Sequence, residues 1–431
     1  MEENPRLSRL EAISGGIKGR PEDFVVEEIT KTGVTIESGR RYSARDLGME
    51  ERDGKFCIFV MEKNNWNTTQ ACREVAGKAG RGFKSVGFAG TKDRRAVTTQ
   101  LCSLYGADPE RLLSVHVKDV SINGVWKSDS EVSMGDLLGN RFTIIVTTED
   151  ALAADKVSAI EGELHGLFPN YFGPQRFGAR GNNVRIGVSI LKGDFEAAAM
   201  AFLADTTGER NADAITAREK LSEDGDFKAA LSYFPGYLKY ELRMLDYLAV
   251  HPTDFANAIR RLPRQIALML VHSVESYIFN AELAARMMEG RIQPEEGDIV
   301  CGSDGRGFPD LAGARASPGT FNEGARFAVG NIIGYGTPSL NRYESGIMDG
   351  LGLKREDFMV KRMPELNCRG SQRVLFAPYT GFEAAGGEGR VMLRFSLPAG
   401  SYATALLDEF VRHGGDAGSA GVVGREGQEE A

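Results

Sequence analysis

The order of hydrophobic and polar positions divides the chain into strand-rich ends and a helical middle. Short apolar or alternating runs predict strands over residues 24–29, 55–61, 86–89, 97–105, 115–122, 141–147 and 390–396. Helical periodicity fills much of residues 182–290 and ends in a long apolar helix over Arg264–Met288. In the first strand, Glu27 and Glu28 indicate an outer edge of the sheet. The pattern predicts a mixed α/β protein.

A charged turn separates the strands predicted at 86–89 and 97–105. Gly90 is a typical turn residue, so Asp93 is expected on or just after a loop that joins two core strands. Lys92, Arg94 and Arg95 surround this carboxylate in the sequence. Nearby positive charge favours its ionised form, which suits a nucleophile or a base. An ordinary solvated turn can carry the same charges, and spacing alone does not separate the two interpretations.

Length and charge limit the possible classes. A chain of 431 residues, 42% of them hydrophobic, predicts two domains or one domain with a large insertion. Its net charge of −8 argues against a general binder of polyanions. RNA binding would therefore depend on local patches. Residues 78–95 carry six basic side chains and one acidic one, and the basic run 361–373 could line a groove.

Cysteine and histidine usage gives no sign of a metal or a disulfide framework. The five cysteines and five histidines are scattered without ligand-like spacing, which predicts reduced thiols in a cytoplasmic protein and no metal site. No phosphate-binding glycine motif is present, so no nucleotide cofactor is expected. The sequence also has no signal-peptide pattern and no apolar run of membrane-spanning length.

Further distinctive stretches occur in a fixed order. Lys18 precedes P-E-D-F at residues 21–24, K-x-N-x-x-T covers residues 63–68, and N-Y-F-G-P-Q-R-F-G covers residues 170–178. Together with G-T-K-D-R-R-A-V-T-T-Q at residues 90–100, these stretches resemble signature blocks of the TruD family of tRNA pseudouridine synthases. The blocks around Pro21, Asp93 and Tyr171 are the most specific, and the resemblance spans most of the chain.

The resemblance implies a particular architecture. We expect a pseudouridine synthase fold with a mixed, mainly antiparallel sheet flanked by helices, formed by residues 1–167 and 375–431. Residues 168–374 are expected to form the inserted α/β TRUD domain of this family. Two lobes would then face each other across a cleft.

The resemblance also implies an isomerisation of uridine to pseudouridine in tRNA, at uridine 13. Asp93 would be catalytic, either attacking C1′ of the ribose or removing a ribose proton, with Lys18 beside it. Phe142 would stack on the flipped uracil, although a core aromatic on a strand face fits its sequence context as well. The residues expected to bind substrate are Lys92, Arg94, Gln100, Asn140, Gln175, Arg176, Arg180, Arg369 and Arg373.

Two other functional classes fit the same residues. A tRNA-binding protein or RNA chaperone without catalysis could use the same basic groove. A carboxylate-dependent hydrolase of glycosidic bonds would release free uracil, but such enzymes usually need a second carboxylate, and none is evident near Asp93 in the sequence. In the family interpretation the protein is a cytoplasmic monomer that binds tRNA and needs no cofactor.

Overall fold

The computed structural model describes residues 4–17, 19–317, 326–387 and 389–413. One long sheet runs through the molecule in the order β14-β15-β7-β2-β5-β3-β6, and β4 pairs with β5 outside this path. Its neighbouring strands are antiparallel except β2 and β5, which are parallel. These strands are β2 (Phe24–Thr30), β3 (Phe56–Asn64), β4 (Val86–Phe88), β5 (Val97–Tyr105), β6 (Val120–Ser128), β7 (Leu137–Thr147), β14 (Thr380–Gly387) and β15 (Arg390–Pro398). The expected mixed, mainly antiparallel sheet is confirmed.

Helices cover one face of this sheet in two separate places. The register of β2 with β5 and β7 puts Val26, Thr98 and Phe142 in one row on that face. At one end the face is covered by α1 (Thr68–Lys78), whose first turn is capped by the Asn67 side chain. At the other end it is covered by α3 (Ala153–Leu164) and α12 (Ala403–Phe410). The central strands β2 and β5 therefore lie between two helical covers.

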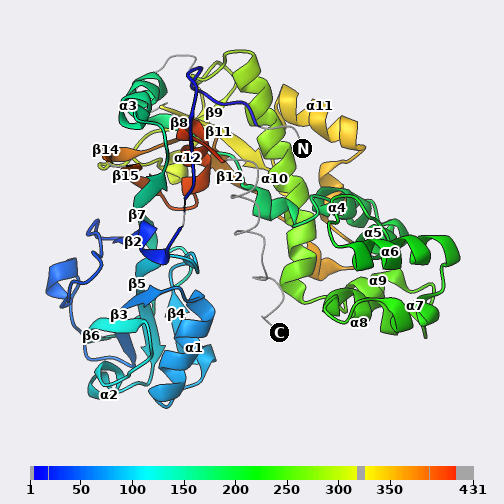
Figure 1. The fold of residues 1–431 in the computed structure, drawn as a ribbon, viewed down its shortest axis with the longest axis horizontal. Coiled ribbons are helices and arrows are strands. Elements are labelled where there is room, and N and C mark those ends of the chain that lie inside the picture. Colours follow the sequence, from blue (N-terminus) through cyan, green and yellow to red (C-terminus); the bar gives the residue numbers. More distant parts are fainter. Residues whose placement is uncertain (1–3, 18, 318–325, 388, 414–431) are drawn as a thin grey trace.

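Most of the remaining helices form a second lobe, on the right in Figure 1. They are α4 (Asn183–Leu191), α5 (Phe195–Leu203), α6 (Ala212–Asp224), α7 (Phe227–Tyr233), α8 (Lys239–Leu248), α9 (Phe255–Ile259), α10 (Arg264–Met288) and α11 (Arg342–Leu351). A four-stranded sheet, β10-β9-β11-β12, lies near β8 and α12 in Figure 1 and packs in their hydrophobic cluster: β9 (Ile299–Cys301), β10 (Arg315–Ala316), β11 (Phe327–Ile332) and β12 (Ser371–Val374). The long helix predicted over Arg264–Met288 is confirmed as α10.

Two short strand pairs connect segments that lie far apart in the sequence. Strand β1 (Ile13–Gly15) pairs with β16 (Val411–His413), and β8 (Leu167–Pro169) pairs with β13 (Phe376–Pro378). The short helix α2 (Pro109–Leu113) precedes β6. Of the helices in the described ranges, none is long and apolar enough to cross a membrane.

Helix α10 takes part in two hydrophobic clusters. Its Leu270, Val274 and Ile278 pack with the other helices of the second lobe. Phe279 and Leu283 pack in the cluster beneath β7, β15 and α12. One continuous helix of 25 residues therefore contributes to the cores of both lobes.

Two expectations from the sequence were wrong. Strand β2 is central, so Glu27 and Glu28 are buried inside the sheet instead of lying at its edge. Each carboxylate meets a cation there: Arg141 Nε is 2.8 Å from Glu27, and Lys92 Nζ is 2.7 Å from Glu28. The strand predicted at 115–122 begins only at residue 120, because Asp119 has a positive φ of 60° that interrupts an extended chain.

Candidate active site

The loop between β4 and β5 is fastened to three neighbouring elements. Lys92 points inward, and its Nζ lies 2.7 Å from the Glu28 carboxylate in β2. The backbone N–H of Lys92 donates to the Thr68 hydroxyl at the start of α1, at 3.0 Å. In β5, the Gln100 amide donates to the carbonyl of Gly90 at 3.1 Å. A loop held at these points keeps the residue at its tip in a defined position.

Lys63 lies directly behind this loop. Its Nζ donates to the backbone carbonyl of Asp93 at 2.8 Å and lies 3.4 Å from that of Lys92. The Lys63 side chain is fully buried. Burial lowers its pKa to about 8, although the nearby charge of Asp93 acts in the opposite direction. Below this pH the loop therefore rests on a buried positive charge.

Asp93 itself lies at the exposed tip of the loop, beside the exposed side chain of Arg94. The next residue, Arg95, donates from its guanidinium to the carbonyl of Gly19 at 3.1 Å. This bond brings the segment before β2 to the loop. Lys18, the predicted partner of Asp93, lies outside the described residues, and its neighbour Gly19 is in contact with the loop.

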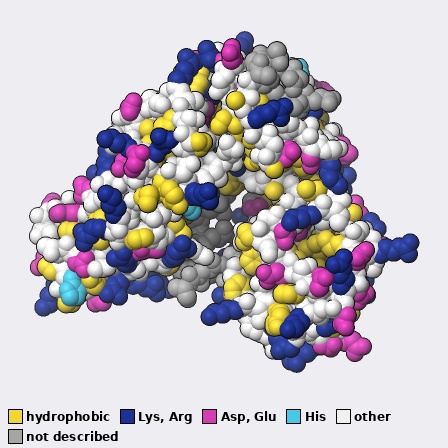
Figure 2. Space-filling model, turned by 180° about the vertical axis from the view of Figure 1, so that it is seen from behind, with side chains coloured by type: hydrophobic (Ala, Val, Ile, Leu, Met, Phe, Trp, Pro, Cys, Tyr) yellow, Lys and Arg dark blue, Asp and Glu magenta, His cyan; other side chains and the backbone are white. Residues whose placement is uncertain are grey.

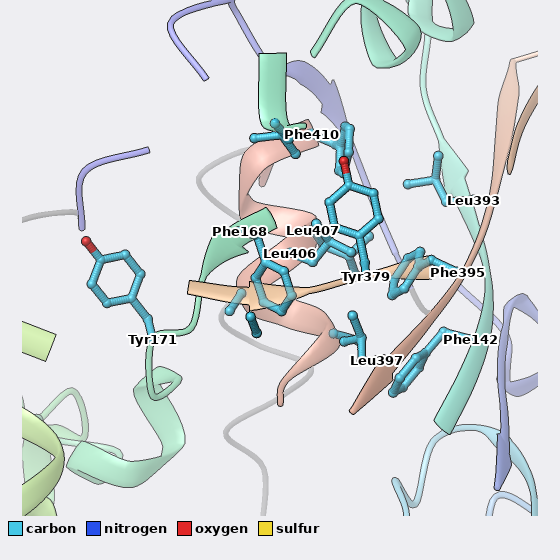
Figure 3. Packing of buried hydrophobic residues seen from close by; sticks show 14 of the residues in the cluster. Phe142, Phe168, Tyr171, Tyr379, Leu393, Phe395, Leu397, Leu406, Leu407 and Phe410 are labelled. Atoms are coloured by element: carbon cyan, nitrogen blue, oxygen red, sulfur yellow. The ribbon is translucent and has the colours of Figure 1, made fainter. Parts of the chain in front are cut away.

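Phe142 belongs to the hydrophobic core beside this loop (Figure 3). Its ring stacks on Phe395, with centroids 5.5 Å apart, and meets the edge of Phe24 at 6.2 Å. Only 5% of the residue is exposed. Ala96, at the end of the loop, packs in the same cluster. The contacts of Phe142 are those of a core aromatic, and its stacking on uracil stays a prediction.

Two polar side chains on the same sheet face have no hydrogen-bond partner among the described residues. They are Asn140, through its Oδ1, and Thr98, through its hydroxyl. Asn140 lies opposite Glu28 in the register, and Thr98 lies in the same row as Phe142. Buried polar atoms normally find a partner. Within the described residues, these two buried atoms lack the partner that such atoms usually have.

A second group of predicted residues lines a pocket between α10 and the end of β15. The pocket has a volume of about 570 Å³, and its lining includes Arg176, Arg369 and Arg373. Arg369 is exposed and Arg176 is half-buried, with its guanidinium 5.4 Å from the centre of the Phe172 ring. Gln175 is exposed next to them. The pocket mouth is therefore basic and polar.

Four of the predicted substrate-binding residues are held by internal contacts. Arg373 donates to the Asn170 side chain at 2.5 Å and to the carbonyl of Gly400 at 2.6 Å. Arg180 donates to two backbone carbonyls at the end of α5 and beyond it, at 2.8 and 2.5 Å. Lys92 and Gln100 are buried in the contacts described above. We interpret these four side chains as residues that hold the fold.

Figure 2 shows a hollow between the two lobes, and its rim carries Lys and Arg side chains among apolar and acidic ones. These basic side chains belong to a chain whose net charge is −8. The positive side chains are thus placed where a polyanion could enter, despite the acidic total.

Some residues that build the site carry no functional signal in the sequence. Lys63, Thr68 and Thr98 stand in the motifs without an indicated role, and the sequence pattern predicts Glu28 at an edge of the sheet. A lysine at the end of an apolar strand was the available signal for Lys63. The contact between this ammonium and the loop carbonyls depends on the pairing of β3 with β5, which the sequence pattern does not specify.

Comparison with known proteins gives a consistent result over nearly the whole chain. The family model described as TruD, tRNA pseudouridine synthase D, matches residues 2–410. The sequence is 34% identical over 429 residues to the "Probable tRNA pseudouridine synthase D" of Thermococcus sibiricus, covering 94% of this chain and 97% of the relative. It is 35% identical over 429 residues to the protein of the same name from Thermococcus onnurineus, with the same coverage.

A solved structure agrees with these sequence matches. The fold resembles a crystal structure from Methanosarcina mazei that bears the name tRNA pseudouridine synthase D, with a TM-score of 0.74 and 30% sequence identity. The similarity covers 94% of this chain and 95% of that chain. Both the central sheet and the second lobe therefore have counterparts in one solved protein.

Proposed function

Because the chain belongs to the TruD family of tRNA pseudouridine synthases, we propose that Asp93 is its catalytic carboxylate. The protein is an isomerase that converts uridine in tRNA to pseudouridine. The N1–C1′ bond breaks, the uracil turns, and C5 becomes bonded to C1′. The C5 proton is lost and N1 gains a proton, so no other group enters or leaves.

The assignment of Asp93 rests on the contacts that hold the loop at residues 90–96 in place. Its neighbours are tied to β2, β5 and α1, whereas Asp93 itself lies at the exposed tip. A reactive group on a rigid mount can be held at one distance from a bound sugar. Asp93 acts either as the nucleophile on C1′ or as the base on a ribose proton, and both roles require the ionised form.

Lys63 supports this role from behind the loop. Its buried ammonium binds the Asp93 carbonyl, and the charges of Lys63 and Asp93 attract each other. Lys63 is thus a positioning residue that also keeps a positive charge beneath the catalytic loop, and Lys18 is proposed to act together with Asp93 by family resemblance.

The target nucleotide must leave the RNA stack to reach Asp93. We propose that the flipped uridine enters beside the loop, where the unpartnered polar atoms of Asn140 and Thr98 face the same side as Phe142. The uracil is proposed to stack on the Phe142 ring, of whose residue 5% is exposed before the substrate binds. By family resemblance the target is uridine 13.

The tRNA backbone is proposed to lie along the rim of the hollow. Arg94 is exposed beside Asp93, and Arg176 and Arg369 line the pocket between α10 and the end of β15. Contacts of this kind set affinity and orientation more than sequence preference. A monomeric state and a cytoplasmic location complete the proposal.

The test is incubation of the purified protein with unmodified tRNA, followed by chemical mapping of pseudouridine. Asp93→Asn should bind tRNA but form no pseudouridine. If the variant retained full turnover, Asp93 would not be the catalytic group. Release of free uracil would instead indicate a hydrolase, and binding without any product from the wild type would indicate a tRNA-binding protein.

A further inference from the structure

Three potential metal ligands meet in the lining of the pocket between α10 and the end of β15. His272 and Glu275 are three residues apart on α10, and Cys368 lies just before β12. One imidazole nitrogen, one carboxylate oxygen and the thiol sulfur all lie within 4.8 Å of one another. Glu275 and Cys368 are buried, and all three residues line the pocket of about 570 Å³. The cluster is thus shielded on one side and open to solvent on the other.

The chemistry of these three groups fits one class of ion. A thiolate, an imidazole and a carboxylate together are a ligand set that Zn²⁺ accepts, with bonds of about 2.0–2.3 Å. Tetrahedral bonds of that length place ligand atoms about 3.5 Å apart, so the side chains would close by roughly 1 Å through rotation. Helical residues in an i, i+3 arrangement are a known source of paired metal ligands. We propose that His272, Glu275 and Cys368 bind one Zn²⁺ ion.

The charges of the ligands support a buried divalent cation. A thiolate and a carboxylate carry two negative charges, which equal the charge of the ion. In the metal-free protein, burial and the neighbouring Glu275 carboxylate raise the pKa of the Cys368 thiol well above its usual range. Zinc would displace the thiol proton, and also the proton of Glu275 where that carboxyl is protonated, forming the Zn–S and Zn–O bonds and releasing the displaced H⁺ to solvent. The fourth position would face the pocket and hold water.

Arg176 opposes this binding. It lines the same pocket. Burial lowers the pKa of His272 and raises that of Glu275 to about 7, and the charge of Arg176 acts to lower both. A guanidinium and a metal ion would compete for the same electrostatic environment. Removal of the Arg176 charge is therefore expected to tighten zinc binding, opposite to the loss of a ligand.

The position of the cluster suggests a structural effect of the ion. Zinc would link α10 to the segment that enters β12, two elements far apart in the sequence. The spacing along the chain predicted no metal site because His272 and Cys368 belong to different parts of the sequence. This site does not depend on the assignment of Asp93, and its loss should affect stability more than the chemical step.

The full-length protein should be purified from zinc-supplemented cells and its metal content measured by mass spectrometry. We expect one zinc per chain, and Co²⁺ substitution should give the charge-transfer absorption of a cobalt–thiolate bond. Cys368→Ser and His272→Ala should weaken zinc binding at least about tenfold. Arg176→Ala should strengthen it.

Cys301→Ser is the matched control, because this variant removes a buried thiol in β9 without touching the cluster. It should bind zinc like the wild type. Absence of zinc from the wild type, together with no cobalt–thiolate band on titration, would overturn the proposal even if the ligand variants fail to fold. Equal zinc content in folded Cys368→Ser would overturn it as well.

Discussion

The buried Nζ of Lys63 donates a hydrogen bond of 2.8 Å to the backbone carbonyl of Asp93. The bond joins the end of β3 to the exposed tip of the loop before β5. It fixes the backbone of the proposed catalytic residue through a charged donor, and such bonds are stronger than those between neutral groups. The carboxylate is thereby oriented from behind, leaving its exposed side for the substrate.

Lys63→Met should lower the rate of pseudouridine formation by at least about a hundredfold, because the loop loses its anchor and its buried cation. Binding of tRNA should change little, since Lys63 is not accessible to it. Single-turnover rates and filter binding on the same preparation separate the two effects. Lys63→Arg should restore part of the rate, whereas an unchanged rate in folded Lys63→Met would show that the anchor is dispensable.

The activity should also decline at alkaline pH. Lys63 is charged below its pKa of about 8 and becomes neutral as the pH rises through that value. The charged donor that holds the backbone carbonyl of Asp93 is then lost, and the loop is held less firmly. Rates measured from pH 6.5 to 9.5 should show this decline in the wild type, and Lys63→Arg should move it to higher pH because arginine stays charged.

Asp93→Asn should abolish turnover, with a rate at least about a thousandfold below the wild type. Asparagine has nearly the same size but can act neither as a nucleophile nor as a base at this position. Lys92 pairs with Glu28, and Lys63 binds the backbone carbonyl of Asp93, so neither contact uses the Asp93 carboxylate. The fold should therefore persist. Circular dichroism and tRNA affinity serve as controls for folding and binding.

A more discriminating substitution at Phe142 is Phe142→Leu. Truncation to alanine would remove a buried ring and lower the free energy of unfolding by about 3–5 kcal/mol. A loss of activity could then come from unfolding instead of from a lost contact with uracil. Leucine keeps most of the apolar volume and should cost less than about 1.5 kcal/mol. If the ring stacks on uracil, the rate should fall about tenfold or more with little change in Tm. A normal rate would leave Phe142 as a core residue alone.

Stability should depend on pH through Glu282 and Glu344, which meet where α10 packs on α11. Both are fully buried, Glu282 accepts from Asn341 at 2.7 Å, and Glu344 accepts from the backbone of Asn331 at 3.1 Å. Burial, and then the charge of Glu344, raise the pKa of Glu282 to about 8. A raised pKa means that the folded state holds a proton that the unfolded chain has released.

The stabilisation by this proton is complete below the ordinary pKa of 4.5 and is lost as the pH rises through about 8. The free energy of unfolding should therefore fall over this range by up to about 1.4 kcal/mol per pH unit. Urea denaturation between pH 5.5 and 8 measures the slope. Glu282→Gln imitates the protonated acid and should flatten it, and an equal slope in wild type and variant would contradict this origin.

Arg369→Ala should weaken the binding of every tRNA sequence to a similar extent. The slope of log binding constant against log salt concentration should become less steep by about one unit. Arg369 is exposed at the pocket mouth. Arg210→Ala is the matched control, because Arg210 is also exposed but belongs to the acidic segment 205–226. Equal losses in both variants would place the RNA elsewhere.

The local elements and the reactive loop could be predicted from sequence because they depend on near neighbours. Alternation and turn residues located β2, β5, β7 and the loop carrying Asp93. The order of strands depends on distant pairings, which is why Glu28 was placed at an edge and its ion pair with Lys92 was missed. The burial of Phe142 against Phe395 likewise comes from a strand near the other end of the chain.

Helix α10 contributes to the hydrophobic clusters of both lobes without interruption. Neither lobe can therefore melt while the other keeps its full core, and thermal denaturation should follow a single cooperative transition. For the same reason, a fragment that ends before residue 264 would lack α10 and would expose apolar residues of both clusters. Such a fragment is not expected to fold like the corresponding part of the full chain.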